Sequence, residues 1–251
     1  MTTLFDHKDY VPPQKKNISE PQAAYALREG WKKVYGKYPS DKSWAIIWAK
    51  TCLETGHFKV GFWNFNFGNI KKKFEATNND KFTMYRCSEI LKKKEIFFDP
   101  PHIQTAFRAY ESLEDGAESY IRFVSGKERY KKAWQKLLEG DAAAYITELK
   151  TAGYFTGSLE TYRNTVVSLV NSFIKRKDDF INWKPTDKIT FKEIGITEQE
   201  LIYYQQIKTL DLYAEEQDTD IEFIEDDINL TVDKNWLLTI LEFLASIFVR
   251  K

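Results

Sequence analysis

The chain has 251 residues, of which 43% are hydrophobic and 16% aromatic, enough to bury a sizeable core. The 37 basic and 37 acidic residues cancel to a formal net charge of zero, which argues against a nucleic-acid-binding protein. The two cysteines imply no disulfide framework, and the three histidines are scattered without a metal-binding motif. We therefore predict neither a metal site nor a cofactor.

The N-terminal part predicts an arm followed by two helices. Residues 1–18 have an irregular pattern and are expected to be mobile or to drape over the surface. Ser19 is expected to cap a helix whose apolar residues recur at helical spacing. Ser40 or Asp41 is expected to cap the next helix, and the buried stripe of that helix ends at Glu54.

Glu54 has the surroundings that a general acid needs. The partial negative charge of the helix end disfavours ionisation of its carboxyl, and so do the aromatic residues that follow. We expect the carboxyl to stay protonated near neutral pH, ready to give its proton to a leaving oxygen. In the alternative interpretation, Glu54 merely closes a helix and Gly56 is its C-cap.

The pattern changes after this helix. Residues 57–100 are predicted to form a small, partly β lobe, in which residues 81–87 alternate as a strand does and residues 95–99 are the expected partner. Ser112 and Asp115 then form a variant of the capping box. Apolar spacing predicts further helices over residues 130–138, 142–149 and 161–176. The predicted fold class is therefore mainly α.

Three segments in order resemble the motifs of one enzyme family. LETG at residues 53–56 with NFGNIK at residues 66–71 is similar to the pattern L-E-[ST]-G … N-x-F/Y-G-[IL]-K. FRAYESLEDG at residues 107–116 and the AGYFT segment within residues 130–162 match two later patterns. These patterns are typical of the peptidoglycan-cleaving glucosaminidases and the lysozyme-like muramidases. The resemblance covers about residues 19–176.

The resemblance implies a lysozyme-like helical domain with Glu54 as the catalytic acid. It also implies that Tyr154 reaches the cleft near this acid, although a buried hydroxyl that packs under the helix is the alternative. The expected substrate-binding residues are Trp63, Phe65, Asn66 and Phe67, which could contact sugar rings or, for the aromatic residues, simply fill the core.

A second group is needed to stabilise the positive charge that develops on the sugar during the reaction. In many glycosidases this group is another carboxylate, which acts as a nucleophile or as a base for water. The candidates are Glu75, Glu89, Glu95 and Asp99, and the last two lie nearest to the place that the family pattern favours. The acetamido group of the substrate is the alternative nucleophile.

Three parts are predicted: the arm over residues 1–18, the lysozyme-like domain over residues 19–176, and an extension over residues 177–251. The extension contains an acidic segment and ends in an apolar helix over residues 235–251. This helix is shorter than the roughly 20 residues that span a bilayer, so we expect it to be buried against its own body or a partner chain.

Two functions follow from these patterns. The first is a hydrolase that cuts peptidoglycan glycan strands between N-acetylglucosamine and N-acetylmuramic acid, either as a glucosaminidase or as a muramidase. A lytic transglycosylase on the same fold is the next alternative. The second is a structural or assembly component that docks through residues 235–251. Residues 1–16 lack the apolar core of a secretory signal, so we expect synthesis in the cytoplasm. The protein would then reach the cell wall after release, as a phage-type lysin or a virion part.

Overall fold

The computed structural model describes residues 7–74, 80–91, 94–99, 101–155 and 157–185. The acidic segment and the predicted terminal helix of the extension lie outside these residues. The helices of the described part are α1 (Glu20–Tyr35), α2 (Asp41–Glu54), α3 (Gly56–Lys59), α4 (Leu113–Gly126), α5 (Lys131–Glu139), α6 (Ala142–Thr151), α7 (Leu159–Lys175) and α8 (Lys177–Asn182). The prediction of a mainly α fold is confirmed.

The helix starts follow from local capping. The Ser19 hydroxyl accepts a hydrogen bond from the backbone N–H of Gln22, at 3.3 Å, and the Gln22 side chain returns one to the backbone of Ser19. Ser40, rather than Asp41, caps α2. Ser112 caps α4 as predicted, accepting from the backbone N–H of Asp115 at 3.1 Å. These contacts satisfy backbone donors that have no partner inside the helix.

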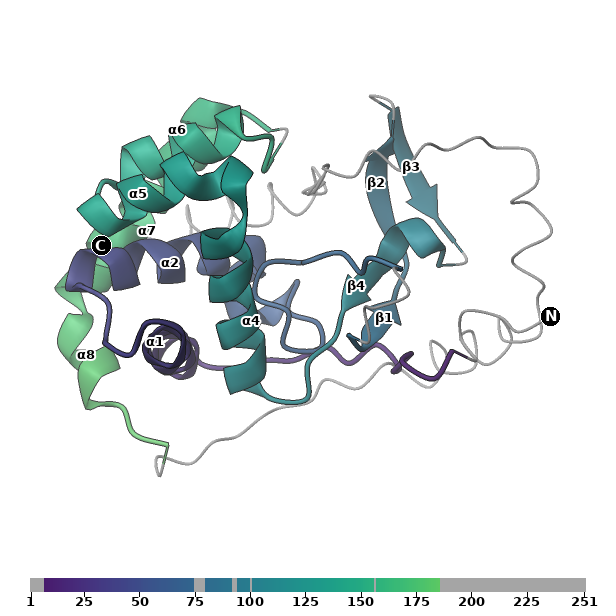
Figure 1. The fold of residues 1–251 in the computed structure, drawn as a ribbon, viewed down its shortest axis with the longest axis horizontal. Helices are drawn as coiled ribbons and strands as arrows, with labels where there is room; N and C mark the ends of the chain where they lie inside the picture. Colours follow the sequence, from purple (N-terminus) through teal and green to yellow (C-terminus); the bar gives the residue numbers. More distant parts are fainter. Residues whose placement is uncertain (1–6, 75–79, 92–93, 100, 156, 186–251) are drawn as a thin grey trace, which may run out of the picture.

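Helix α2 lies in the middle of the helical body, between α1 and α7, and runs toward the small lobe (Figure 1). It is buried on almost every side, from Ser43 to Glu54. Its aromatic residues pack against α7, where the rings of Trp44 and Phe173 meet edge to face with centroids 4.9 Å apart. Because so much apolar surface surrounds α2, its end is a rigid place for a reactive side chain.

The packed body continues past residue 176, where the sequence predicts the end of the lysozyme-like domain, and the division into three parts stays a prediction. Helix α8 follows α7 directly, and its Phe180 is buried with its ring stacked on Phe173, centroids 4.4 Å apart. Residues 177–182 therefore belong to the core of the helical body. The sequence suggested a boundary because a run of charged residues precedes Phe180, and one apolar residue after such a run does not indicate a buried helix.

The small lobe is partly β, as expected, but its strands pair differently. Strand β1 (Phe82–Met84) pairs antiparallel with β4 (Ala106–Arg108), and β2 (Cys87–Leu91) pairs antiparallel with β3 (Lys94–Phe98). The run 81–87 thus breaks after β1, and only its last residue reaches the predicted partner, with Cys87 opposite Phe98. Within the described residues, no helix is both long enough and apolar enough to cross a membrane.

The N-terminal arm is part of the body from about residue 9 onward. The backbone N–H of Val11 donates to the carbonyl of Phe82 at 2.8 Å, and that of Lys16 donates to the carbonyl of Phe62 at 2.7 Å. Ile18 is buried in the core. The arm therefore connects the small lobe to α1 along the surface of the body.

Candidate active site

Glu54 is the last residue of α2, and an unusual turn follows it. Gly56, His57 and Phe58 all have left-handed backbone angles, with φ of 55°, 56° and 60°. For residues with a Cβ this conformation costs about 1–2 kcal/mol each. The Thr55 hydroxyl supports the turn, accepting from the backbone N–H of Phe58 at 3.1 Å. The chain thus changes direction immediately after Glu54.

The Glu54 carboxyl is buried, and its two oxygens have different surroundings. Oε1 lies 3.2 Å from the ammonium of Lys50, one helical turn earlier, and accepts a hydrogen bond from the Tyr162 hydroxyl. Oε2 is also buried but has no hydrogen-bond partner among the described residues. A buried polar atom without a partner is rare in folded proteins and often marks a reactive position.

Lys50 is fully buried and is shared between two groups. Its ammonium donates to the Tyr154 hydroxyl at 2.5 Å and also lies 3.7 Å from the centre of the Tyr154 ring. Burial lowers the pKa of Lys50 to about 8, against the opposing effect of the nearby Glu54 charge. Lys50 thus connects Tyr154 to Glu54. Tyr154 is fully buried, as in the alternative interpretation of a buried hydroxyl, and its place in a substrate cleft stays a prediction.

Aromatic rings enclose this polar group. Burial, followed by the Glu54 charge, raises the pKa of both Tyr154 and Tyr162 well above the usual value, so both keep their protons. The Tyr162 ring stacks on Phe155, with centroids 4.1 Å apart. Only 2% of the Glu54 side chain is exposed. Among the described residues, the Glu54 carboxyl is therefore enclosed and linked to Tyr162 of α7.

The structure places most of the predicted sugar-binding residues in the core. Phe67 is fully buried, and Phe65 is buried too. Asn66 uses its amide to donate to the carbonyls of Ile70 and Arg108, at 3.0 Å each, and to accept from the backbone N–H of Ile70 at 2.8 Å. These residues build the loop, which argues against a direct contact with sugar.

Trp63 differs from its neighbours in this loop. It is partly exposed, and its ring stacks on Tyr85 with centroids 4.9 Å apart and an interplanar angle of 17°. A supported, partly exposed indole is suited to stacking on a sugar face. Trp63 therefore stays a candidate for substrate binding.

The motif glycines are explained by close packing. A Cβ on Gly68 would lie 2.6 Å from the Tyr120 ring, and a Cβ on Gly116 would lie 2.0 Å from the carbonyl oxygen of Phe65. Gly116 belongs to the second motif segment, Phe65 lies between the two parts of the first, and Tyr154 belongs to the third. The three segments therefore meet around Lys50 and Glu54.

None of the predicted second carboxylates contacts Glu54 among the described residues. Asp99 lies 3.6 Å from the Arg86 guanidinium, and Glu95 is exposed on β3. The hairpin formed by β2 and β3 projects from the small lobe, apart from α2 (Figure 1). The side chain of Glu89 is not described, and Glu75 lies outside the described residues.

The sequence did not single out Lys50 or assign a role to Tyr162. Lys50 could have been noticed, because it is a charged residue on an otherwise apolar stripe, four positions before Glu54. Tyr162 closes the third motif, but its contact with Glu54 depends on how α7 packs against α2. That packing is tertiary and leaves no local signal.

Comparison with known families identifies the family of this chain. The model of the glucosaminidase family, described as mannosyl-glycoprotein endo-beta-N-acetylglucosaminidase, matches residues 30–175, more than half of the chain. The chain belongs to the glucosaminidase family. The predicted resemblance is thereby confirmed, and with it the broad class of glycoside hydrolase. No curated protein matches the chain significantly.

Solved structures give a weaker likeness to this glucosaminidase domain. A peptidoglycan hydrolase from Sphingomonas sp. A1 is 23% identical, covering 66% of this chain and 94% of that one, with a TM-score of 0.44. A mutant peptidoglycan hydrolase from the same organism is 22% identical, covering 62% and 96%, with a TM-score of 0.46. The glycoside hydrolase domain of Salmonella typhimurium FlgJ is 16% identical, covering 64% and 92%, with a TM-score of 0.44. These scores are low, so the family assignment depends on the family match.

Proposed function

We propose that this protein hydrolyses the glycan strands of peptidoglycan next to N-acetylglucosamine, with Glu54 as the general acid. The observation that carries the proposal is the buried Glu54 carboxyl, whose Oε1 is held by Lys50 and Tyr162 while Oε2 has no partner. The family match supports a glycosidic bond of N-acetylglucosamine as the target. The three motif segments support peptidoglycan as the polymer.

The proton that Glu54 donates can be accounted for by its pairing with Lys50. The ion pair and its neutral form, with uncharged Lys50 and protonated Glu54, hold the same number of protons. Burial lowers the pKa of Lys50 to about 8, so its ammonium is the group from which the carboxyl can take this proton. Because Oε1 already accepts hydrogen bonds, Oε2 is the oxygen that carries the proton to the substrate.

In the reaction, the proton on Oε2 passes to the glycosidic oxygen as the bond from that oxygen to the anomeric carbon breaks. The departing sugar leaves as an alcohol, and the anomeric carbon becomes electron-poor. Water then adds to this carbon, and its proton returns to Glu54. For this to occur, the buried Glu54 side chain has to become accessible to the substrate.

The group that stabilises the anomeric carbon is either the acetamido oxygen of the substrate or one of the two carboxylates that the family pattern favours, Glu95 and Asp99. Glu95→Gln, with Asp99→Asn beside it, distinguishes the two. If the acetamido group acts, both variants keep their activity. If a carboxylate acts, one of them loses it.

Product analysis on defined muropeptides tests the proposal. Mass spectrometry is expected to find fragments with reducing N-acetylglucosamine ends that have gained one water. Reducing N-acetylmuramic acid ends would instead identify a muramidase, and anhydro ends would identify a transglycosylase. Intact muropeptides, from a protein shown to be folded, would contradict the proposal.

A further inference from the structure

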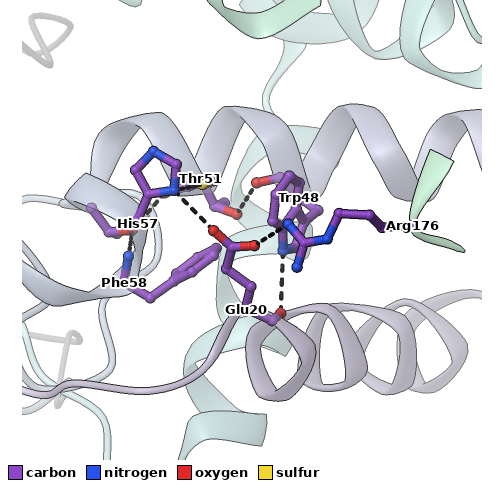
Figure 2. A network of polar contacts seen from close by, with 8 residues as sticks. Glu20, Trp48, Thr51, His57, Phe58 and Arg176 are labelled. Atoms are coloured by element: carbon purple, nitrogen blue, oxygen red, sulfur yellow. Dashed lines mark hydrogen bonds and ion pairs between the residues drawn. The ribbon is translucent and has the colours of Figure 1, made fainter. Parts of the chain in front are cut away.

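A second cluster of reactive side chains lies at the same end of α2 but outside the Glu54 site. His57 Nδ1 lies 3.3 Å from the Cys52 sulfur and 3.0 Å from Glu20 Oε1. All three donor atoms lie within 4.8 Å of one another. Figure 2 shows the Glu20 carboxylate between His57 and Arg176, with α1 on one side and α2 on the other. The proposed reaction uses none of these groups.

This cluster cannot work as a nucleophilic relay of the cysteine–histidine–carboxylate kind. Such a relay needs two different imidazole nitrogens, one facing the thiol and one facing the carboxylate. In this protein the same nitrogen, His57 Nδ1, makes both contacts. Burial also raises the pKa of the Cys52 thiol well above its usual value, so it is not an activated nucleophile.

The same geometry does suit a metal ion, because three donors converge on one point. Tetrahedral zinc has bonds of about 2.3 Å to sulfur and about 2.0–2.1 Å to nitrogen and oxygen, which puts neighbouring ligands about 3.3–3.6 Å apart. Two of the separations, 3.3 Å and 3.0 Å, are already close to this range. A thiolate, an imidazole and a carboxylate together favour Zn²⁺ over Mg²⁺ or Ca²⁺.

The charges around the cluster are compatible with a dication. Arg176 donates to Glu20 Oε2 at 2.8 Å, which orients the carboxylate and leaves Oε1 directed at His57. Although burial acts in the opposite direction, the hydrogen bonds from His57 and Arg176 lower the pKa of Glu20, so it is ionised. A bound dication would supply the charge that a buried Cys52 thiolate needs. Arg176 and the nearby Lys59 oppose metal binding, and the two anionic ligands offset them.

The three ligands come from well-positioned elements. Glu20 is the first residue of α1, and its carbonyl accepts a hydrogen bond from the Trp48 indole at 3.3 Å (Figure 2). Cys52 lies in the last turn of α2, and His57 lies in the left-handed turn. The Glu20 and His57 side chains are 22% and 18% exposed, so an ion can reach them from solvent.

We propose that Glu20, Cys52 and His57 bind one Zn²⁺ ion, with water at the fourth position. The ion connects the start of α1 to the turn after Glu54 and offsets the strain at His57. This differs from the expectation of no metal site, which was based on the scattered histidines. The spacing between Cys52 and His57 is not a common zinc pattern, and Glu20 comes from another helix.

The test uses the full chain with Co²⁺ as a spectroscopic probe of the zinc site. The wild type is expected to develop a thiolate-to-cobalt charge-transfer band that saturates at one ion per chain. Cys52→Ser is expected to lose the band, whereas the matched control Cys87→Ser keeps it. Absence of the band in the wild type, or its survival in Cys52→Ser, would overturn the proposal.

Calorimetric titration with Zn²⁺ gives an independent measurement if Cys52→Ser fails to fold. His57→Gln and Glu20→Gln are each expected to weaken Zn²⁺ binding at least about 10-fold. Circular dichroism checks that these variants are folded. An affinity equal to that of the wild type in folded His57→Gln would overturn the proposal. Neither measurement depends on glycan hydrolysis, so the zinc site and the proposed reaction are tested separately.

Discussion

Replacing Lys50 with methionine tests the buried pair that the proposed mechanism depends on. The ammonium is fully buried, and its pKa falls from 10.5 to about 8. A shift of this size corresponds to about 3 kcal/mol. Because the unfolded state binds more protons than the folded state between pH 8 and 10.5, the wild-type protein gains stability as the pH rises through this range.

About 2 kcal/mol of this gain is expected between pH 7.5 and 9.5. This window stays below pH 10.0, the ordinary pKa of tyrosine. Above that pH, tyrosines ionise in the unfolded state and weaken folding, because burial raises their pKa only in the folded state. Urea unfolding, followed by tryptophan fluorescence, measures the free energy of unfolding. The difference in the free energy of unfolding between the wild type and Lys50→Met should change by about 2 kcal/mol from pH 7.5 to 9.5. Lys132→Met, at an exposed position of α5, is the matched control and should run parallel to the wild type. If the free energy of unfolding of Lys50→Met depends on pH as that of the wild type does, the reasoning from a buried Lys50 charge is refuted.

Three further predictions concern the surroundings of the site. Tyr162→Phe removes a hydrogen bond to a carboxylate and should cost about 1.5–3 kcal/mol in urea unfolding; an unchanged free energy would mean that this bond does not form in solution. Trp63→Ala should raise KM on soluble glycan more than it lowers kcat, and an unchanged KM would remove Trp63 from the substrate path. Gly116→Ala forces a Cβ against the carbonyl of Phe65 and should destabilise by about 2 kcal/mol or more, whereas Gly126→Ala, in open space, should not. Equal thermal midpoints for the two glycine variants would contradict the packing described.

The starts of the helices could be predicted because their signals are local. Ser19 and Ser112 precede helical apolar patterns, and each accepts the backbone hydrogen bond that its position predicts. Strand pairing could not be predicted in the same way. The partner of β1 is β4, more than twenty residues later, and nothing within the run 81–87 indicates it. Pairing of this kind is decided by how the whole lobe packs.

The candidate site was predictable only in part, for a related reason. Glu54 carries a motif and lies at a helix end, so the sequence could single it out as a candidate. Asn66 and Phe67 were assigned to substrate, but the structure uses them to hold the loop. Amide and aromatic residues serve equally well in a core or in a binding site, so their type does not decide between the two.

Lys50 and Tyr162 complete the Glu54 site through contacts that depend on tertiary packing. Lys50 lies on α2 itself, yet its partner Tyr154 comes from the segment after α6. Tyr162 reaches Glu54 from α7. Only the assembled helices bring these side chains together, which explains why the sequence predicted an acid among aromatic rings but not its pairing with a lysine.

The role of Glu54 as the proton donor is tested most directly by Glu54→Gln on purified cell walls. Glutamine keeps the shape of the side chain but has no proton to donate. Clearing of the walls should fall by about 100-fold or more while circular dichroism shows an unchanged fold. Glu114→Gln, at an exposed position of α4, should clear the walls as fast as the wild type. A folded Glu54→Gln variant with undiminished clearing would contradict the proposed mechanism.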